Sequence, residues 1–369
     1  MAKPDLLIVG GGIIGCSAAA FAAEQGASVL LVEGSQLAAG ASGRNSGVVQ
    51  HPFDTVLAPL HQATLEVYRE LSDGSSDFEF PADPSGLLLL TDDAAAAHAR
   101  VAELLDQEPA LAAEFLDSEA LAALEPMLAH GLSAIRLATG YPIPPEAATR
   151  AMAARAMRAG AELRIAQPVS AVHEEPAVSL ADGNRLEAGA VLVAAGPWSA
   201  PLLDPSGAWQ PIRPTHGVTV QVSLPTTPSS VLEEGAVHTV NRPVAGGDAA
   251  AGLVTFSMVS AAGISTVGST FLSAAPDPEQ MAPVLLAHGS RFVPALRDAA
   301  ILRSRVCARP QSIDGHPFIG PLPGRARVFM AAGHGPWGIS TGPASAAIVV
   351  DAILRGTPVP AGVEAARPL

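Results

Sequence analysis

The sequence predicts an α/β fold, α+β overall, in which a Rossmann-like unit carries an inserted unit of mixed or antiparallel β-sheet. Three features predict it. Residues 5–33 alternate strand, glycine turn, helix and strand, residues 190–196 form an apolar strand that ends in small residues, and period-two runs alternate with loops between residues 206 and 301. The first two patterns are typical of a buried parallel sheet, and the third is typical of an antiparallel sheet beside it.

The N-terminal segment predicts a site for an adenine dinucleotide. Glycines follow its first strand at the spacing G-x-G-x-x-G, which permits a tight turn, close approach to a pyrophosphate, and close packing of helix on strand. The N-terminus of the helix then faces the phosphates. Glu33 lies at close to the spacing of about 20 residues at which a carboxylate reaches a ribose hydroxyl. A glycine turn without a ligand is the alternative. The residues expected to hold the dinucleotide are Gly10, Gly12, Ile13, Ile14, Gly15, Glu33, Gly34 and Ser35.

The composition is that of a well-buried enzyme rather than a nucleic-acid-binding protein. The chain has 369 residues, which suggests two packed units, with 49% apolar and 15% charged residues. A net charge of −14 disfavours nucleic acid and anionic membrane surfaces as partners. The sole lysine is Lys3, so a mechanism that needs a buried lysine is excluded unless Lys3 supplies it.

The expected location is cytoplasmic. Cys16 and Cys307 give no disulfide framework, which indicates a reducing compartment. The first strand starts at residue 5, which leaves no room for a signal peptide, and no apolar run is expected to span a bilayer. No metal site is expected.

Further cofactor contacts are expected from a loop and from later strands. Residues 40–47 form a polar, glycine-rich loop that offers backbone N–H donors, with a flexible surface connection as the alternative. The strand at 190–196 ends in a glycine that lets backbone lie over a cofactor. The residues expected at the cofactor from these parts are Ala41, Ser42, Arg44, Asn45, Ser46, Gly47, Val169, Ala195, Gly196 and Trp198.

The remaining elements follow from hydrophobic periodicity. Helices are expected at 55–72, where His61 packs on the apolar face, twice within 93–128, and at 277–290; strands are expected at 86–91, 134–137, 162–166, 169–172, 177–180, 218–222, 253–259, 264–271 and 328–332. A last helix is expected to be capped by Thr341 or Gly342 with Pro343 in its first turn, and the last dozen residues look like a loose tail. The predicted nucleotide domain comprises 1–85, 143–205 and 302–369, and the predicted substrate domain comprises 86–142 and 206–301.

Together these motifs resemble the FAD-dependent D-amino-acid oxidase superfamily, the group with glycine oxidase, sarcosine oxidase and D-amino-acid dehydrogenases. The likeness covers nearly the whole chain, in order. It rests on residues 10–33, 41–43, 191–199, 211–217, 309–310 with 314–315, and 333–335. The first motif is shared by many FAD enzymes, and the last two narrow the resemblance to this superfamily. It implies an FAD domain and a mixed-sheet substrate domain with the flavin between them.

The resemblance also implies residue roles. Arg309 corresponds to the arginine that grips the substrate carboxylate, and a guanidinium fork suits that task; an internal salt bridge is the alternative. Backbone N–H groups at 335–340 are expected to meet negative charge on the flavin. Trp337 is a candidate wall of the substrate pocket or a packing residue. The residues of this turn expected at the cofactor are Gly333, His334, Gly335, Pro336, Trp337, Gly338 and Ile339.

Three further residues are candidates with open alternatives. Cys307 lies in a segment that resembles the one carrying the flavin-linking cysteine of sarcosine oxidase, although a small core cysteine with noncovalent FAD is favoured. His216 stands where some relatives carry arginine. His216 and His51 are candidate substrate contacts, with hydrogen-bonded structural histidines as the alternative.

The expected function is oxidation of the C–N bond of a small amino acid (a D-amino acid, glycine or an N-alkyl amino acid) by hydride transfer from Cα to flavin N5, followed by hydrolysis of the imine. One alternative is a 2-hydroxy-acid oxidase or dehydrogenase, since Arg309 would hold either substrate and residues 45–48 resemble hydroxyglutarate oxidases. Another is a flavoprotein subunit that relays electrons without a substrate of its own. The expected electron acceptor is O2 or, because no lysine is available above the flavin, a quinone or a protein; a homo- or hetero-oligomer is possible.

Overall fold

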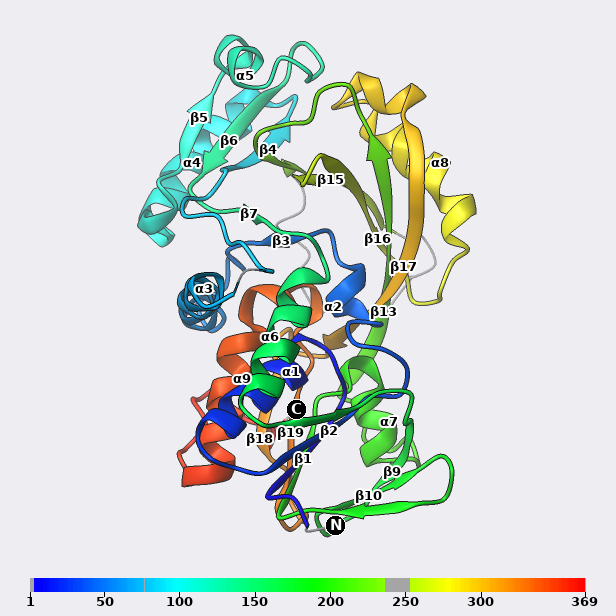
Figure 1. Cartoon of the computed structure of the whole chain (residues 1–369). Helices are drawn as coiled ribbons and strands as arrows, with labels where there is room; N and C mark the ends of the chain where they lie inside the picture. The colour runs from blue at the N-terminus through cyan, green and yellow to red at the C-terminus, as the bar shows by residue number, and fades with distance from the viewer. Residues whose placement is uncertain (1–2, 76, 236–252, 369) are drawn as a thin grey trace.

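A six-stranded sheet beside the two termini and an eight-stranded sheet at the opposite end form the two halves of the molecule (Figure 1). The computed structural model describes residues 3–75, 77–235 and 253–368. The predicted α/β fold, with its Rossmann-like unit and its second unit of mixed strands, is confirmed. Part of the predicted substrate domain, residues 236–252, lies outside the described residues.

The six-stranded sheet is the Rossmann-like core. Its order is β18-β19-β12-β1-β2-β8, and all neighbours are parallel except β18 and β19. The central strands are fully apolar and buried because both faces of the sheet are covered. The strands span Phe318–Pro321, Val328–Ala332, Ala190–Val193, Leu6–Val9, Val29–Val32 and Glu162–Arg164.

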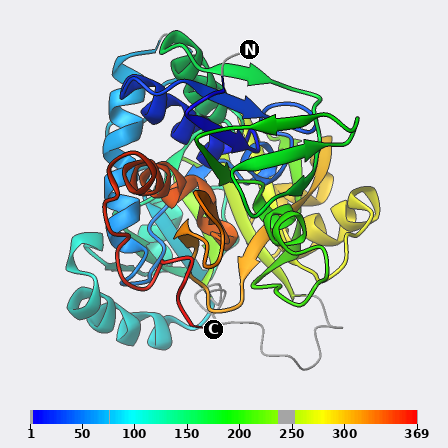
Figure 2. The same ribbon diagram turned by 90° about the horizontal axis from the view of Figure 1, so that it is seen from below.

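Helices cover one face of this sheet and a small antiparallel sheet covers the other. The alanine-rich α1 packs between α6 and α9, and α3 lies against α9 (Figure 2). These helices span Ile13–Glu24, Ala147–Arg158, Gly338–Arg355 and Ala58–Asp73. The other face carries β9, β10, β11 and α7, which span Val169–Val172, Ala177–Leu180, Arg185–Glu187 and Ser199–Leu203.

The eight-stranded sheet has the order β17-β13-β16-β15-β14-β4-β6-β5 and is antiparallel except for the pair β14 and β4. Its strands span Ala300–Ser312, Ile212–Ser223, Ile264–Phe271, Leu253–Ala261, Val231–Glu234, Leu87–Thr91, Ser133–Leu137 and Glu114–Leu116. The helix α8 packs on β13, β15 and β16, and α4 and α5 lie at the β5 end (Figure 1). These helices span Pro278–Gly289, Ala94–Gln107 and Ser118–Leu124.

The longest pairing in the molecule corrects one expectation. β17 pairs with β13 along its whole length, from Ile212 opposite Ser312 to Ser223 opposite Ala300. Residues 302–312, which were expected in the nucleotide domain, therefore belong to the eight-stranded sheet. The other boundaries of the two domains remain a prediction.

Two shorter segments also differ from expectation. The stretch 93–128 contains the strand β5 between its two helices, because Leu116 pairs with Ala134 and is buried. The loop at 40–47 contains a helical turn, α2, at Ala41–Arg44, and is followed by β3 (Val48–Val49), which pairs with β7 (Tyr141–Pro142).

The helix α9 begins at Gly338, five residues before the proline that was expected in its first turn. Pro343 has no N–H group and cannot donate to the carbonyl oxygen of Ile339, one turn earlier. The hydroxyl of Tyr68 in α3 donates to that oxygen instead, at 2.8 Å. The buried carbonyl is therefore satisfied, and the helix continues through the proline.

One further expectation concerns length and hydropathy. Residues 335–355 form a stretch of 21 residues that contains an 18-residue window with a mean hydropathy of 1.3, long and apolar enough to cross a membrane by length and composition alone. The expectation that no apolar run reaches this length is corrected. However, 67% of that window is buried inside the protein, and the helix α9 packs against α1 and α3, as expected of a core helix.

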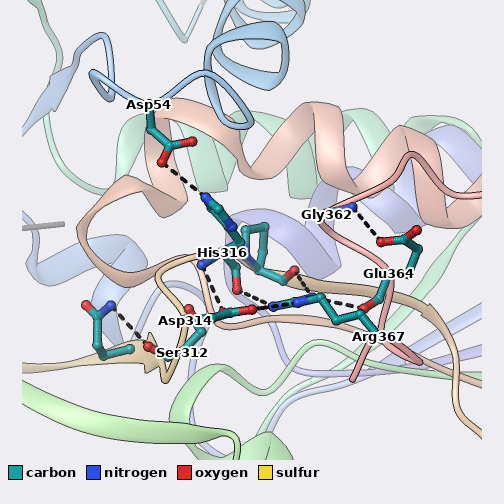
Figure 3. Close-up of polar contacts among 9 residues, drawn as sticks. Asp54, Ser312, Asp314, His316, Gly362, Glu364 and Arg367 are labelled. Carbon is teal, nitrogen blue, oxygen red and sulfur yellow. Dashed lines mark hydrogen bonds and ion pairs between the residues drawn. The ribbon is translucent and has the colours of Figure 1, made fainter. Parts of the chain in front are cut away.

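The C-terminal segment is anchored, not loose. Arg367 donates to both carboxylate oxygens of Asp314, at 2.7 and 2.9 Å, and its guanidinium lies 3.8 Å from the ring centroid of Phe318. Figure 3 shows the network continuing from His316 to Asp54, which lies just before α3, at 3.1 Å. The C-terminus, the turn after β17 and the start of α3 are thus held together.

We expect Arg367→Ala to lower the free energy of unfolding by about 2–4 kcal/mol, because it removes two donors from the carboxylate of Asp314 and the guanidinium donors of the His316 and Pro317 carbonyl oxygens. Chemical denaturation of the flavin-loaded protein measures the change. Arg355→Ala is the matched control, since that side chain is 60% exposed and pairs with Asp351 on the same helix, and it should cost less than about 0.5 kcal/mol. Equal free energies of unfolding for the two variants would show that the contacts of Arg367 do not stabilise the protein.

Candidate active site

A cavity of about 720 Å³ lies between the carboxyl ends of the parallel strands and the inner face of the eight-stranded sheet. Its volume is within the range of cofactor and ligand sites. Both sheets, α2, the N-terminus of α1 and the N-terminus of α9 contribute to its wall. A ligand in it would therefore touch segments from both ends of the chain.

The cavity brings together most of the predicted site residues. Those that line it are Gly10, Gly12, Ile13, Ile14, Glu33, Gly34, Ser35, Ala41, Ser42, Arg44, Asn45, Ser46, Val169, Ala195, Gly196, Trp198, His216, Cys307, Arg309, His334, Gly335, Pro336, Trp337, Gly338 and Ile339. Four predicted site residues do not line it: Gly15, Gly47, Gly333 and His51.

The three glycines outside the cavity shape the backbone around it. A Cβ atom on Gly15 would lie 1.9 Å from the carbonyl oxygen of Gly10, so this glycine lets α1 approach β1. Gly47 and Gly333 lie in turns with φ of +88° and +91°, a region that favours glycine. Their part in cofactor binding is thus indirect.

The nucleotide end of the cavity is built from a glycine turn and two acceptors. The Ser42 hydroxyl accepts from the N–H of Ile13 at 3.0 Å, which fixes α2 against the start of α1. The Glu33 carboxylate accepts from the N–H groups of Gly11 and Ser35, at 2.7 and 2.9 Å. Glu33 therefore fixes the turns on either side of it and also lines the cavity.

Arg309 occupies the opposite end. Its guanidinium donates to the carbonyl oxygen of Thr270, at 2.8 Å, and to the hydroxyl of Ser269, and lies 4.5 Å from the ring centroid of Phe271. A Cβ atom on Gly217 would lie 2.2 Å from this guanidinium, so only glycine leaves room for it there. Burial lowers the pKa of Arg309 from its ordinary value, yet arginine keeps its charge at neutral pH.

No described carboxylate lies within ion-pair distance of Arg309. The alternative of an internal salt bridge is therefore not met among residues 3–75, 77–235 and 253–368. Among the described residues the partly buried guanidinium has neutral partners only, so no protein carboxylate balances its charge.

The histidines divide into two groups. His216 and His334 line the cavity, and the Nδ1 atom of each is buried without a protein partner. Burial lowers the pKa of His334 to about 3, so its ring is neutral, and its Nε2 atom is 2.9 Å from the hydroxyl of Ser345. His51 lies behind the wall: its Nδ1 atom accepts from the N–H of Phe53, and its Nε2 atom is 3.7 Å from Glu108.

His61 is buried on α3, as the helical periodicity predicted, and its ring lies beside that of His51, with ring centroids 5.6 Å apart. Burial, with a smaller contribution from His51, lowers the pKa of His61 to about 4. Because His51 is in this structural pair and does not line the cavity, the structure gives no support to it as a substrate contact.

The remaining candidates have mixed surroundings. Trp337 lines the cavity and also packs against the core around α1, so its surroundings are compatible with both alternatives. Cys307 is buried, lines the cavity and pairs with Gly217 across the strands. Trp198 is 57% exposed at the rim.

Sequence reasoning missed a polar group of residues on the wall formed by the eight-stranded sheet and the end of β3. Those that line the cavity are Gln50, Thr219, Glu233, Thr255, Ser257 and Ser269. The period-two pattern held a signal for Thr219, Thr255 and Ser257, since alternate side chains of a strand share one face. Glu233 had none, because β14 has only four residues. Burial raises the pKa of Glu233 to about 7.

The cavity fits an adenine dinucleotide with a ring system between the two sheets. The start of α1 presents N–H groups behind a turn in which a Cβ atom on Gly12 would lie 3.0 Å from the Ser42 hydroxyl oxygen. Polar atoms of Gln50, Thr219, His216 and His334 are buried there without partners, and buried polar groups ordinarily have them.

Comparison with known proteins also indicates a chain that binds an adenine dinucleotide, namely FAD. A sequence model of the family described as FAD dependent oxidoreductase matches residues 5–352. Glycine oxidase of Geobacillus kaustophilus is 28% identical over 386 residues, which cover 95% of this chain and 93% of that protein. Glycine oxidase of Pseudomonas putida is 29% identical over 187 residues, which cover 49% of this chain and 46% of that protein.

Solved structures share the fold over the whole chain. The structure of glycine oxidase from Geobacillus kaustophilus has a TM-score of 0.82 at 22% identity, covering 99% of this chain and 98% of that one. Iminodiacetate oxidase from Chelativorans sp. BNC1 has a TM-score of 0.80 at 23% identity, with 96% of each chain covered. The chain thus belongs to the FAD-dependent oxidoreductase family, within the D-amino-acid oxidase superfamily.

Proposed function

We propose that the protein oxidises the C–N bond of a small amino acid, namely a D-amino acid, glycine or an N-alkyl amino acid, to an imine that hydrolyses in water. FAD, when bound, supplies the acceptor for the hydride that leaves Cα. The observation that carries the proposal is the partly buried Arg309 guanidinium in the cavity, which no described carboxylate balances.

Arg309 anchors the substrate through its carboxylate. Two of its N–H groups are fixed by Ser269 and Thr270, which sets the plane of the fork, and the others are free to meet two carboxylate oxygens. Desolvation strengthens this pairing. A fixed anchor of this kind orients Cα toward the cofactor and removes rotational freedom before the reaction.

The N-terminus of α9 stabilises negative charge that develops on the cofactor. Gly338, Ile339 and Ser340 form its first turn and line the cavity. Their N–H groups and the positive end of the helix dipole lie in a site shielded from water, where such an interaction is strongest.

We propose that FAD is held noncovalently. Cys307 lines the cavity, so a bond to the flavin through its thiol remains the alternative. Acid precipitation of the purified protein separates the two: we expect a yellow supernatant and a colourless pellet. A yellow pellet that becomes colourless in the Cys307→Ser variant would establish the covalent link instead.

An anaerobic bleaching screen tests the reaction itself. We expect at least one small amino acid to reduce the flavin and to release ammonia or an alkylamine. Bleaching by 2-hydroxy acids alone would establish the hydroxy-acid alternative, and no bleaching at all, with a partner protein that co-purifies, would favour the electron-relay subunit.

The same screen, repeated in air with peroxide detection, identifies the electron acceptor. The sole lysine, Lys3, pairs with Glu187 at 3.9 Å on the surface and does not line the cavity. We therefore propose that the electrons pass to O2 or, alternatively, to a quinone or a protein. Rapid peroxide formation would establish O2.

Arg309→Ala should raise the substrate KM by roughly a hundredfold or more, because a buried bidentate ion pair is lost, while the FAD content stays unchanged. Steady-state kinetics with the best substrate of the screen measures it. If KM barely moves, the assignment of Arg309 is wrong.

Two further variants sharpen this test. Arg303→Ala removes an exposed arginine from the same strand and should leave KM within about twofold. Gly217→Ala keeps Arg309 but places a methyl group where its guanidinium lies, so it should raise KM by roughly tenfold or more.

A further inference from the structure

A row of side chains crosses the sheet beside Arg309. Thr219 lies opposite Gly268, Gly268 opposite Ser257, and Ser257 opposite Glu233, on four neighbouring strands. Directly paired residues point to the same face of a sheet, and Thr219, Ser257 and Glu233 all line the cavity. Among the described residues that line it, Glu233 is the one carboxyl group on the eight-stranded sheet.

Gln50 fixes the carboxyl group of Glu233 from across the cavity wall. The Gln50 backbone N–H donates to the hydroxyl of Ser340 at 3.0 Å, which ties it to the start of α9. Its side-chain Nε2 atom donates to Glu233 at 3.1 Å. Its Oε1 atom is buried without a protein partner, in a residue that is only 4% exposed.

The two side chains together present more acceptors than donors. Gln50 donates one of its two amide N–H groups to Glu233 and leaves Oε1 without a protein partner, and an ionised Glu233 offers only oxygen acceptors. Such a pair suits a ligand group that carries several N–H donors. It does not suit a carboxylate, which would bring more acceptors and a like charge.

The distance to Arg309 suits an amino acid. The guanidinium bonds to Ser269 and Thr270, which lie on β16, and β14 is two strands further along the sheet. Two strand spacings amount to roughly 10 Å. An amino acid with one ion-paired carboxylate and one hydrogen-bonded nitrogen can bridge that gap.

We propose that Glu233, oriented by Gln50, binds a cationic nitrogen of the substrate while Arg309 binds its carboxylate. The proposal rests on the proposed function and narrows its substrate class: monocarboxylates with a cationic nitrogen are accepted, and amino diacids are disfavoured because a second carboxylate would face Glu233. The nitrogen is that of the α-amino group or of a side chain, and the test separates the two. A cation at this position also favours the ionised form of Glu233, whose pKa burial raises to about 7 in the free protein.

Ligands that cannot be oxidised at Cα test the proposal without turnover. Two matched pairs isolate the nitrogen: 2-aminoisobutyrate against isobutyrate for the α-nitrogen, and 6-aminohexanoate against hexanoate for a distal nitrogen. Titration of the flavin-loaded enzyme, followed by calorimetry or by the flavin absorbance, gives Kd for each ligand. The ratio of the two Kd values within a pair measures how much the nitrogen contributes to binding.

In the unsubstituted protein, the nitrogen-containing ligand of one pair should bind about ten- to hundredfold tighter than its nitrogen-free partner. The pair that shows this difference identifies whether the α-nitrogen or a distal nitrogen is bound. Glu233→Gln should reduce this ratio to within about twofold and leave the nitrogen-free ligand unchanged. Gln50→Met should reduce it as well, because the unpartnered Oε1 atom is lost. Glu234→Gln is the matched control, since Glu234 pairs with His288 at 2.8 Å and does not line the cavity, and should keep the ratio.

A ratio near one in both pairs, or a ratio that survives Glu233→Gln, overturns the proposal. Should one variant fail to retain FAD, the other decides. These titrations involve no oxidation. If the protein shows the preference but no amino acid bleaches its flavin, the proposed function is wrong and the nitrogen site still stands.

Discussion

The partly buried positive charge of Arg309 organises the cavity. The Arg309 guanidinium lies among neutral groups, the Thr270 carbonyl, the Ser269 hydroxyl and the ring of Phe271. Moving a charge out of water is costly unless another charge or several hydrogen bonds balance it. The sheet supplies the hydrogen bonds, and no described carboxylate balances the charge. We therefore propose that the position that costs stability in the free protein is the one that selects a carboxylate ligand.

Much of the fold serves to hold that strand in place. β17 pairs along its full length with β13, and Gly217 on β13 gives the guanidinium its space. Just beyond the end of β17, Asp314 is clamped by Arg367 from the C-terminus, and His316 contacts Asp54 before α3. In turn, the hydroxyl of Tyr68 on α3 donates a hydrogen bond to the carbonyl oxygen of Ile339 at the start of α9, whose first turn lines the cavity. The strand that carries Arg309 and the first turn of α9 are thus connected through part-buried and buried hydrogen bonds.

How much could be predicted from the sequence depended on whether the signal was local. The glycine turn, Glu33 and the strand at 190–193 follow from spacing and apolar runs, and most residues of the predicted site do line one cavity. Residues 302–312 were assigned to the nucleotide domain although they lie in a strand of the eight-stranded sheet, because the pairing of 300–312 with 212–223 is a long-range contact that no local pattern encodes. The tail was missed for the same reason, since Arg367 finds its partners about 50 residues away in sequence. Glu233 and Gln50 look like ordinary surface polar residues until two sheets enclose them.

The central claim is that one cavity holds FAD and places the substrate carboxylate on Arg309. A crystal structure of the FAD-loaded enzyme with an unreactive carboxylate ligand such as 2-aminoisobutyrate tests it most directly. The account predicts two carboxylate oxygens at about 3 Å from the guanidinium of Arg309. A carboxylate bound elsewhere, with Arg309 paired to an acidic side chain of the protein itself, would contradict it.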